Sequence, residues 1–299
     1  MDRSENSSSI IIPDLARVAK AAAAHFQVDV TSEWYCDRSE CDGKPHGEWT
    51  KKHARTKQRP PTTDDDWFVW MLMAGRGFGK TRAGAEWLAY QARKYPRTQW
   101  GAIGRTIEQT RTVCFEGESG LLDCLGLSIT SHVYNRTTGE ITLPNGSRIY
   151  KFSAENPDSM IGHNLHGAWC DELGTWHYKE AWDRGLIFAI RKSPDGKLRP
   201  HIVVTTTPRN IGLVKELKNA ETTRLTYGST YENVENLSVD QLAEFERKYG
   251  HGSRLGRQEL YGELLEDVPG ALWTDDLIES TTILNVPGMK PALFASKED

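Results

Sequence analysis

The stretch from Trp67 to Trp87, WFVWMLMAGRGFGKTRAGAEW, constrains the fold more than any other part of the chain. It begins with an apolar run, Val69 to Met73, which is typical of a buried strand, and continues into a glycine-rich turn. The residues after the turn, TRAGAEWLAYQARK, have the composition and the period of a helix. This order of strand, glycine turn and helix predicts an α/β domain in which the loop after a strand binds an anion.

Residues 74–81, AGRGFGKT, fit the phosphate-binding pattern G-x-x-x-x-G-K-[ST] when alanine is accepted at its first position. The three glycines allow successive backbone N–H groups to converge on one hollow, and the helix expected over residues 80–93 adds the positive end of its dipole. We predict that Lys80 reaches the β- and γ-phosphates of a nucleotide and that the Thr81 hydroxyl holds Mg²⁺. The alternative is a glycine loop that binds no nucleotide.

Length and composition set the limits for the rest of the chain. With 299 residues it can form one large α/β domain with appendages or two small domains. A net charge of −4 means that any contact with nucleic acid must come from a local basic face. Five scattered cysteines indicate no disulfide framework, no stretch offers 18 apolar residues, and the polar N-terminus is unlike a secretory signal. We therefore expect a soluble intracellular protein without a membrane segment.

Two segments precede the phosphate loop. We expect a short helix over residues 10–26, followed by a turn-rich basic arm that contains Cys36, Cys41, His46 and His53. These four side chains could form a small zinc site, because thiolate and imidazole ligands suit tetrahedral Zn²⁺. The alternative is a surface arm in which the cysteines and histidines are incidental.

Further α/β units are predicted after the loop. The sequence Pro-Asn-Gly within residues 139–152 is typical of a hairpin, which we expect at the edge of the sheet. The other expected elements are a strand over residues 98–104, a broken helical stretch over 106–125, a buried strand in 201–209, a helix over 213–220, a strand over 223–229 and an interrupted helix over 239–261.

The run HGAWCD followed by Glu172 has the pattern of a buried strand that ends in two carboxylates. We predict that Asp171 binds Mg²⁺ through its hydration shell and that Glu172 polarises the water that attacks the γ-phosphate. On its own such a pair is more often a surface acidic turn. Its position downstream of a phosphate loop, with βα units between them, favours the catalytic interpretation.

Three threonines, Thr205, Thr206 and Thr207, end the apolar run HIVVTTTPR. Hydroxyls at the carboxyl end of a parallel strand can contact the γ-phosphate or the attacking water, and their contacts change when the γ-phosphate is lost. The alternative is an ordinary β-rich run, since threonine favours strands.

Four motifs in order, AGRGFGKTRAGAEW, FSAENPDSMIGHNLHGAWCDEL, VVTTTPR and ELYGELLEDVPGALW, resemble the ATPase half of the large terminase subunit of tailed double-stranded DNA phages. The resemblance covers roughly Gln58 to Trp273. It implies a P-loop ATPase of the type with an added catalytic glutamate, with a mostly parallel central sheet, helices on both faces and an added hairpin. We expect an N-terminal arm over residues 1–57, the ATPase domain over 58–275 and a tail or linker over 276–299.

The resemblance also implies function and partners. The family's ATPase uses ATP and Mg²⁺ to drive double-stranded DNA into the procapsid. Its partners would be double-stranded DNA, the portal protein of the procapsid and the small terminase subunit. The chain would act as a homo-oligomeric ring in the host cytoplasm, transiently at the portal and not in the mature virion.

Single residues receive roles from the same resemblance. Gln58 would contact adenine, Glu172 and Lys80 would be catalytic, and Asp171 would bind the metal together with Thr81. Arg76 would stabilise charge in the transition state, although it could be a surface arginine that touches phosphate without catalytic effect. The implied nucleotide-binding residues are Gln58, Gly75, Arg76, Gly77, Phe78, Gly79, Lys80, Thr81, Arg82, Thr205, Thr206 and Thr207. The threonines would also couple hydrolysis to movement of the part that grips DNA.

Two features depart from the family pattern. Relatives usually have Arg-Gly where this chain has Ile161-Gly162, so a role of that arginine is not carried over. The family's second half, an RNase H-like nuclease expected after about residue 280, is absent, so we expect a shortened product, one half of a split gene or a fragment, without DNA cleavage. In a ring, an arginine of the neighbouring subunit would complete each site, and the candidates are Arg105, Arg111 and Arg136.

Two other classes of function stay open from the sequence. Another DNA-directed ATPase, such as a helicase or recombination motor, would share the loop and the acidic pair but should carry further motifs with downstream arginines, which we do not find. A non-catalytic assembly platform is the second class. The intact set of Lys80, Thr81, Asp171 and Glu172 argues against it.

Overall fold

A computed structural model describes residues 34–36, 42–44, 53–62, 67–250 and 252–265. The helix expected over residues 10–26 and the tail expected over residues 276–299 lie outside this part of the chain. The proposed start of the ATPase domain at residue 58 lies inside it, within a short 3₁₀ turn, η1 (Thr56–Gln58).

Eight strands of the described residues form one sheet. Their bounds are β1 (Val69–Ala74), β2 (Gln99–Gly104), β3 (Tyr134–Asn135), β4 (Glu140–Thr142), β5 (Arg148–Ser153), β6 (Gly167–Asp171), β7 (His201–Thr206) and β8 (Thr223–Gly228). The strand order is β3-β4-β5-β2-β6-β7-β1-β8, and only the β3-β4 and β4-β5 pairs are antiparallel. The mostly parallel sheet confirms the predicted fold class.

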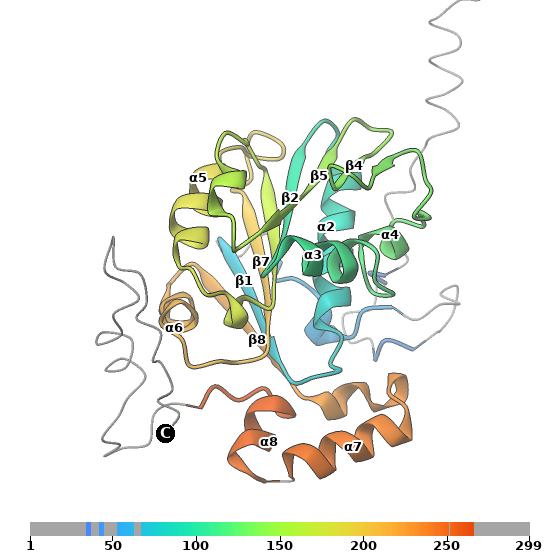
Figure 1. Ribbon diagram of the computed structural model, residues 1–299, viewed down its shortest axis with the longest axis vertical. Helices are drawn as coiled ribbons and strands as arrows, with labels where there is room; N and C mark the ends of the chain where they lie inside the picture. Colours follow the sequence, from blue (N-terminus) through green and yellow to red (C-terminus); the bar gives the residue numbers. More distant parts are fainter. Residues whose placement is uncertain (1–33, 37–41, 45–52, 63–66, 251, 266–299) are drawn as a thin grey trace, which may run out of the picture.

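Helices cover both faces of this sheet, as predicted (Figure 1). The α-helices are α2 (Lys80–Lys94), α3 (Ile107–Gln109), α4 (Leu121–Cys124), α5 (Ile187–Ala189), α6 (Gly212–Asn219), α7 (Val239–Tyr249) and α8 (Arg254–Glu259). The remaining turns are 3₁₀ (η3, Pro157–Met160; η4, Leu173–Thr175; η6, Thr230–Asn236) or π-helical (η2, Thr110–Phe115; η5, Ala181–Leu186). Figure 1 shows α2, α3 and α4 on one face and α5 and α6 on the other, with α7 and α8 beyond the end of β8.

Side chains of β1 alternate between two apolar cores. Trp70 and Leu72 pack in the cluster that contains the buried residues of α2, whereas Val69, Met71 and Met73 pack in the cluster that contains α6. All five side chains are at most 2% exposed. A strand that is buried on both faces needs apolar residues at every position, which explains the unbroken apolar run before the phosphate loop.

The predicted hairpin forms from β4 and β5, in which Ile141 pairs with Ile149. Gly146 in its turn has a φ of 83°, which favours glycine. The Asn145 side chain donates to the backbone oxygens of Ala92 and Arg93, at 2.9 and 3.0 Å, near the end of α2. Since β5 also pairs in parallel with β2, the hairpin extends the sheet at its edge, as predicted.

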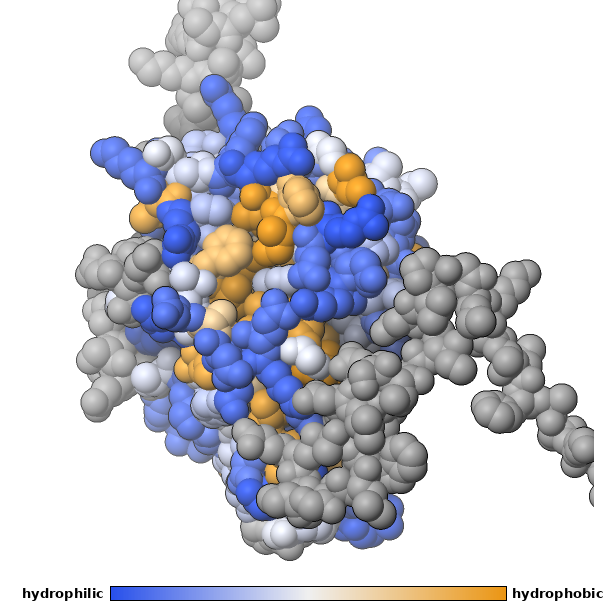
Figure 2. Space-filling model, turned by 90° about the vertical axis from the view of Figure 1, so that its left-hand side faces the viewer, coloured by the Kyte–Doolittle hydropathy of each residue, from blue (hydrophilic) through white to orange (hydrophobic). Residues whose placement is uncertain are grey.

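The face that carries α5 and α6 has apolar surface between polar side chains (Figure 2). In α5, Phe188 is 61% exposed and Ile187 is 36% exposed. Of the helices that the structure describes, none has the length and apolar composition needed to cross a membrane.

Candidate nucleotide-binding and hydrolysis site

The predicted phosphate loop lies between β1 and α2, at the carboxyl edge of the sheet. Gly77 and Gly79 have left-handed backbone conformations, with φ of 72° and 93°, which L side chains rarely adopt. Gly75 is required for a different reason, because a Cβ at this position would lie 2.2 Å from the backbone oxygen of Leu260. Two glycines of the loop are therefore fixed by backbone conformation and one by close packing.

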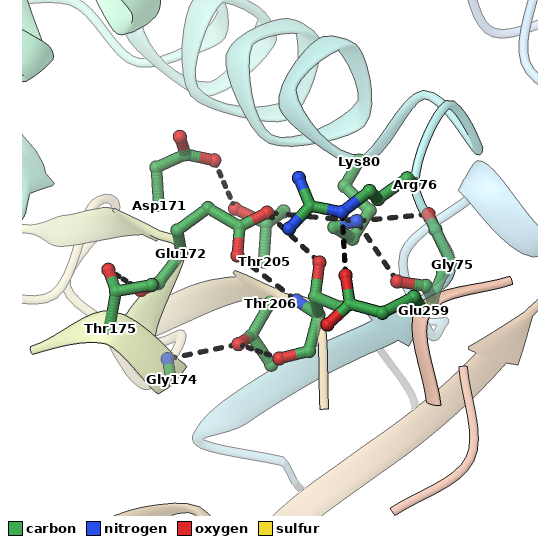
Figure 3. Close-up of polar contacts among 12 residues, drawn as sticks. Gly75, Arg76, Lys80, Asp171, Glu172, Gly174, Thr175, Thr205, Thr206 and Glu259 are labelled. Atoms are coloured by element: carbon green, nitrogen blue, oxygen red, sulfur yellow. Dashed lines mark hydrogen bonds and ion pairs between the residues drawn. The ribbon is translucent and has the colours of Figure 1, made fainter. Parts of the chain in front are cut away.

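Lys80, the first residue of α2, lies beside the loop (Figure 3). Its Nζ donates to the backbone oxygens of Ala74 and Gly75, both at 3.0 Å, and lies 3.7 Å from Oε1 of Glu172. Burial lowers the pKa of Lys80, and the nearby Glu172 carboxylate opposes this shift. An ammonium that is held by two carbonyl oxygens and one carboxylate can exchange these contacts for phosphate oxygens.

Asp171 ends β6, and its partner in the parallel register is Thr205 of β7. The residue is 2% exposed, and its Oδ1 accepts a hydrogen bond from the Thr205 hydroxyl at 2.7 Å. The Cys114 thiol donates a second hydrogen bond to the same carboxyl group. Burial, and then the charge of Glu172, raise the pKa of Asp171 to about 7. A buried carboxylate of this kind is stabilised in its ionised form by a bound cation.

Glu172 leaves the strand with a left-handed backbone, φ 47° and ψ 47°, which is uncommon for a residue other than glycine. Its side chain points toward Lys80 and Arg76 (Figure 3). The N–H of Thr207 donates to Oε2 at 3.2 Å and the Thr207 hydroxyl lies 3.4 Å from Oε1. The carboxylate is therefore held between β7 and the phosphate loop, where the sequence predicted a base.

The three threonines make different contacts. The Thr205 hydroxyl donates to Asp171, the Thr206 hydroxyl accepts the N–H of Gly174 at 2.9 Å, and Thr207 contacts Glu172. Thr205 and Thr206 are fully buried, so their hydroxyls are satisfied within the protein. The run thus contacts both acidic residues, while its predicted contact with a γ-phosphate stays a prediction.

Trp169 connects the acidic strand β6 with the loop helix α2. Its indole N–H donates to the Thr205 hydroxyl at 2.8 Å. Because an indole can only donate, the hydroxyl proton of Thr205 is left for Asp171. The ring lies where a Cβ at Gly84 would be, 2.2 Å from Nε1, so α2 needs glycine at this position. The sequence analysis missed Trp169; the available signal was an isolated glycine inside a helix.

The C-terminal helices contact the loop through Arg76. Its Nε lies 2.6 Å from Oε2 of Glu259, and its backbone N–H donates to the backbone oxygen of Glu259 at 2.8 Å. The Thr230 hydroxyl donates to the backbone oxygen of Arg76 at 2.7 Å, and the guanidinium lies 5.9 Å from the Tyr249 ring centroid. Glu259 belongs to a motif that carried the resemblance, but the sequence analysis gave it no role.

Gln58, the predicted adenine contact, lies against the other side of the loop. Its Nε2 donates to the backbone oxygen of Gly79 at 3.1 Å, and its Oε1 accepts from the N–H and Nε of Arg55, both at 3.2 Å. Arg55, which the sequence analysis missed, donates to the backbone oxygens of Phe78 and Glu232. The structure thus places Gln58 at the nucleotide loop, and adenine recognition stays a prediction.

A model of the family described as terminase large subunit, T4likevirus-type, N-terminal, matches residues 71–280. The match begins in β1 and includes the phosphate loop, the acidic pair, the threonine run and Glu259. It spans more than half of the chain. This chain belongs to the large terminase family. A search of curated proteins found no match.

Solved structures of large terminases share the fold of this terminase chain. The ATPase domain of the Thermus phage P74-26 large terminase superposes with a TM-score of 0.53 and 14% identity, over 74% of this chain and 99% of that domain. A large terminase of a thermophilic bacteriophage, solved in complex with ADP, gives a TM-score of 0.51 and 15% identity, over 68% of this chain. The chain spans about half the length of that second protein, since the match covers 50% of it.

Two residues of the implied nucleotide-binding set have side chains directed elsewhere. Phe78 is fully buried beneath the Arg55 guanidinium, 4.5 Å from the ring centroid, so only its backbone is available to a nucleotide. Arg82 pairs with Glu86 and Asp123, each at 2.6 Å. In this terminase site, the side chains of Phe78 and Arg82 therefore stabilise the loop and α2. Their contact with a nucleotide stays a prediction.

The three arginines that could complete the site of a neighbouring subunit differ in the carboxylates that they contact within this chain. Arg111 and Arg136 both lie 2.8 Å from the Glu116 carboxylate. Arg105 follows β2 at the carboxyl edge of the sheet, and its contact with Glu155 is longer, 3.8 Å. Ile161, at the position where relatives have arginine, is 54% exposed.

The zinc hypothesis concerns two described and two undescribed residues. Cys36 is buried beside Arg59, whose Nη2 lies 2.8 Å from Sγ, and His53 is buried as well. Cys41 and His46 lie outside the described residues. Within the described part of the chain, no group of three or more His, Cys, Asp or Glu side chains could hold a metal ion.

Proposed function

We propose that this terminase chain hydrolyses ATP and that hydrolysis drives double-stranded DNA into a procapsid. The observation that carries the proposal is the convergence of Lys80 from α2 with Glu172 from the end of β6 at 3.7 Å, beside the buried Asp171. Lys80 and Glu172 are 92 residues apart in the chain, and their convergence at a glycine loop supports a hydrolytic rather than a purely nucleotide-holding site. Membership of the large terminase family supports the use of that energy for DNA packaging.

The donor set of the site fits Mg²⁺. The Asp171 carboxylate and the Thr81 hydroxyl would hold the ion, since Mg²⁺ prefers oxygen ligands and is usually bound through one or two carboxylates together with phosphates. Burial has raised the pKa of Asp171 to about 7, which is the expected signature of a carboxylate whose compensating cation comes with the ligand. When bound, Mg²⁺ would neutralise charge on the phosphates.

In the proposed reaction, Glu172 orients the attacking water and accepts its proton. Its contacts with Thr207 fix the direction of the carboxylate. Lys80 and the backbone N–H groups of the loop stabilise the negative charge on the phosphoryl oxygens. Arg76 would contribute to the same stabilisation after leaving Glu259, which holds its guanidinium in the structure.

We further propose the partners that the family implies: the portal protein, the small terminase subunit and a ring of identical chains, acting in the host cytoplasm. Adenine recognition by Gln58 and completion of the site by a neighbouring arginine belong to the same proposal. A helicase or recombination motor is a weaker candidate, because the family match includes the phosphate loop, the acidic pair and the threonine run.

Steady-state ATP hydrolysis with and without double-stranded DNA tests this proposal, with nucleotide binding followed separately by a fluorescent analogue. We expect Glu172→Gln to lower turnover by about 10²-fold or more while binding persists. Lys80→Ala should weaken both binding and turnover. Glu180→Gln, an exposed carboxylate outside the site, is the matched control and should keep wild-type turnover.

Tight binding without turnover under all conditions, including high protein concentration and added DNA, would contradict the hydrolytic assignment and favour the assembly platform. Turnover that is the same in Glu172→Gln and in the control would exclude Glu172 as the base.

A further inference from the structure

The backbone of Glu172 has a conformation that needs support from its surroundings. Its φ and ψ are both 47°, in the left-handed region, where the Cβ of an L residue lies too close to a carbonyl oxygen. Among the described residues other than glycine, only Arg97 also has a positive φ. Such a conformation persists only where neighbouring contacts hold it, so the contacts around Glu172 show what positions its carboxylate.

This left-handed residue changes the direction of the side chain. Side chains of a strand alternate between its two faces, so a continued β6 would direct Glu172 into the core cluster that contains Cys170. Instead, Leu173 takes a place in that core, and the Glu172 carboxylate lies 3.7 Å from the Lys80 ammonium. The backbone conformation of one residue therefore determines whether the proposed base lies at the phosphate loop.

Thr175, the last residue of η4, holds the Glu172 backbone with two hydrogen bonds. The Thr175 N–H donates to the Glu172 carbonyl oxygen at 2.8 Å, and the Thr175 hydroxyl donates to the same oxygen at 2.7 Å. Figure 3 shows Thr175 on the side of Glu172 that is away from Lys80. The first bond comes from the backbone, whereas the second needs a hydroxyl, which only threonine or serine can supply at this distance.

A second threonine fixes the same turn from β7. The Thr206 hydroxyl accepts the Gly174 N–H at 2.9 Å and donates to the Thr207 backbone oxygen at 2.9 Å. A Cβ at Gly174 would lie 2.8 Å from the Thr206 hydroxyl, so the close contact needs glycine. The indole N–H of Trp176 donates to the Asp171 backbone oxygen at 3.2 Å. The turn that contains Thr175 is therefore attached to both β6 and β7.

We propose that Thr175 is a positioning residue for Glu172. Its hydroxyl stabilises the left-handed backbone that keeps the carboxylate between Thr207 and Lys80. This inference rests on the proposed function, because the direction of the carboxylate matters for turnover only where Glu172 is the base. Thr175 acts through Glu172 and takes no part in the reaction itself, so its loss should lower turnover without lowering nucleotide affinity.

ATP turnover and nucleotide affinity of single variants test this role. Thr175→Ala removes the hydroxyl, and we expect kcat to fall about fivefold, which corresponds to one lost hydrogen bond, while the affinity for a fluorescent ATP analogue stays within about twofold. Thr175→Ser keeps the hydroxyl and should retain most of the turnover. Thr175→Val keeps the shape without the hydroxyl and replaces Thr175→Ala if that variant fails to fold.

Ser159→Ala is the matched control. The Ser159 hydroxyl also donates to the backbone oxygen of the residue three positions earlier, Asn156, at 2.7 Å, and it also lies in a 3₁₀ turn, η3. Ser159 is exposed and lies outside the proposed site. The control variant should therefore keep wild-type turnover and nucleotide affinity.

Zero-length carbodiimide cross-linking of Lys80 to Glu172 in the full chain reports the position of the carboxylate without hydrolysis. We expect the yield of the cross-linked peptides, measured by mass spectrometry, to fall about threefold or more in Thr175→Ala. The yield should stay at the wild-type level in Thr175→Ser and in Ser159→Ala. If the wild type forms the cross-link but does not hydrolyse ATP, the proposed function fails, and the cross-link yield alone decides the positioning role.

Equal cross-linking in the wild type and in Thr175→Ala would overturn the proposal, because the carboxylate would then keep its place without the hydroxyl. A parallel fall of turnover, nucleotide affinity and melting temperature, with unchanged cross-linking, would likewise show that Thr175 only stabilises the fold.

Discussion

Arg76 of the phosphate loop and Glu259 of α8 form an ion pair, with 2.6 Å between Nε and Oε2. The arginine is partly exposed, whereas the glutamate side chain is 5% exposed. The same residues are joined by a backbone hydrogen bond of 2.8 Å, so the loop and the C-terminal helices are held together by both side chain and main chain. A movement of these helices would therefore change the position of the arginine at the nucleotide site.

The first prediction concerns the stability that this pair contributes. Arg76→Ala leaves the Glu259 carboxylate buried without its partner, and we expect the free energy of unfolding to fall by about 2 kcal/mol. Glu259→Gln removes the charge while keeping the shape, so the double variant should regain part of the loss. Urea denaturation of the two single variants and the double variant gives the coupling energy. Strictly additive effects would show that the pair is not coupled in solution.

The second prediction concerns Trp169, which we infer to be a positioning residue for Asp171, the proposed metal ligand. Trp169→Phe keeps a ring against Gly84 but removes the N–H that orients the Thr205 hydroxyl. We expect the half-saturating Mg²⁺ concentration for ATP hydrolysis to rise about fivefold, corresponding to one lost hydrogen bond. Nucleotide binding measured without Mg²⁺ should stay unchanged. Trp182→Phe, in the core on the other face of the sheet, is the control.

If Trp169 had only a packing role, nucleotide affinity in EDTA and maximal turnover would fall together with stability, and the Mg²⁺ requirement would not change on its own. Calorimetric titration of Mn²⁺ into the nucleotide-bound variant gives a second readout that does not depend on turnover.

The third prediction is a pH dependence of stability. Burial raises the folded-state pKa of Asp171 to about 7, whereas an unfolded chain gives about 3.9. Between these values the folded state holds a proton that the unfolded state has lost, so stability rises as the pH falls from 7 toward 4. We expect the wild type to gain up to about 1.4 kcal/mol per pH unit over this window relative to Asp171→Asn.

Urea denaturation in the metal-free state at several pH values measures this difference. Burial lowers the pKa of His163 and His166, and these residues act in the opposite direction, but they do so in both proteins and cancel in the comparison. A difference between wild type and Asp171→Asn that does not change with pH would show that Asp171 ionises normally in the folded chain.

Most elements of the fold could be predicted from the sequence because their signals are local. The apolar run before the phosphate loop, the Pro-Asn-Gly turn and the helix after Lys80 each follow from the period and the turn residues, and each element forms within one or two residues of its expected bounds. The convergence of Lys80 with Glu172 also followed, because carboxyl ends of parallel strands share one edge of a sheet.

The contacts that could not be predicted join segments far apart in the chain. Glu259 contacts Arg76, which is 183 residues away in the sequence, and Arg55 contacts the Phe78 backbone, which is 23 residues away. The hydrophobic periodicity of a sequence does not predict such pairs. The threonines show the same limit: alternation places Thr205 and Thr207 on one side of the strand, but only the register with β6 shows that they contact Asp171 and Glu172.

The last prediction identifies Arg105 as the arginine that completes a neighbour's site. Arg111 and Arg136 share the largely buried carboxylate of Glu116, so releasing either would leave that charge less compensated. Among the described residues, the carboxylate that Arg105 contacts is the exposed Glu155, at the longer distance of 3.8 Å. Arg105→Ala should lower ATP turnover by about 10²-fold at protein concentrations that favour assembly, with nucleotide binding retained.

Mixing Arg105→Ala with Glu172→Gln should restore part of the activity. In a mixed assembly, some sites combine the intact Glu172 of an Arg105→Ala subunit with the intact Arg105 of a neighbouring Glu172→Gln subunit. A Lys80→Ala and Glu172→Gln mixture is the control and should stay inactive, and equal failure of both mixtures would show that Arg105 does not act between subunits.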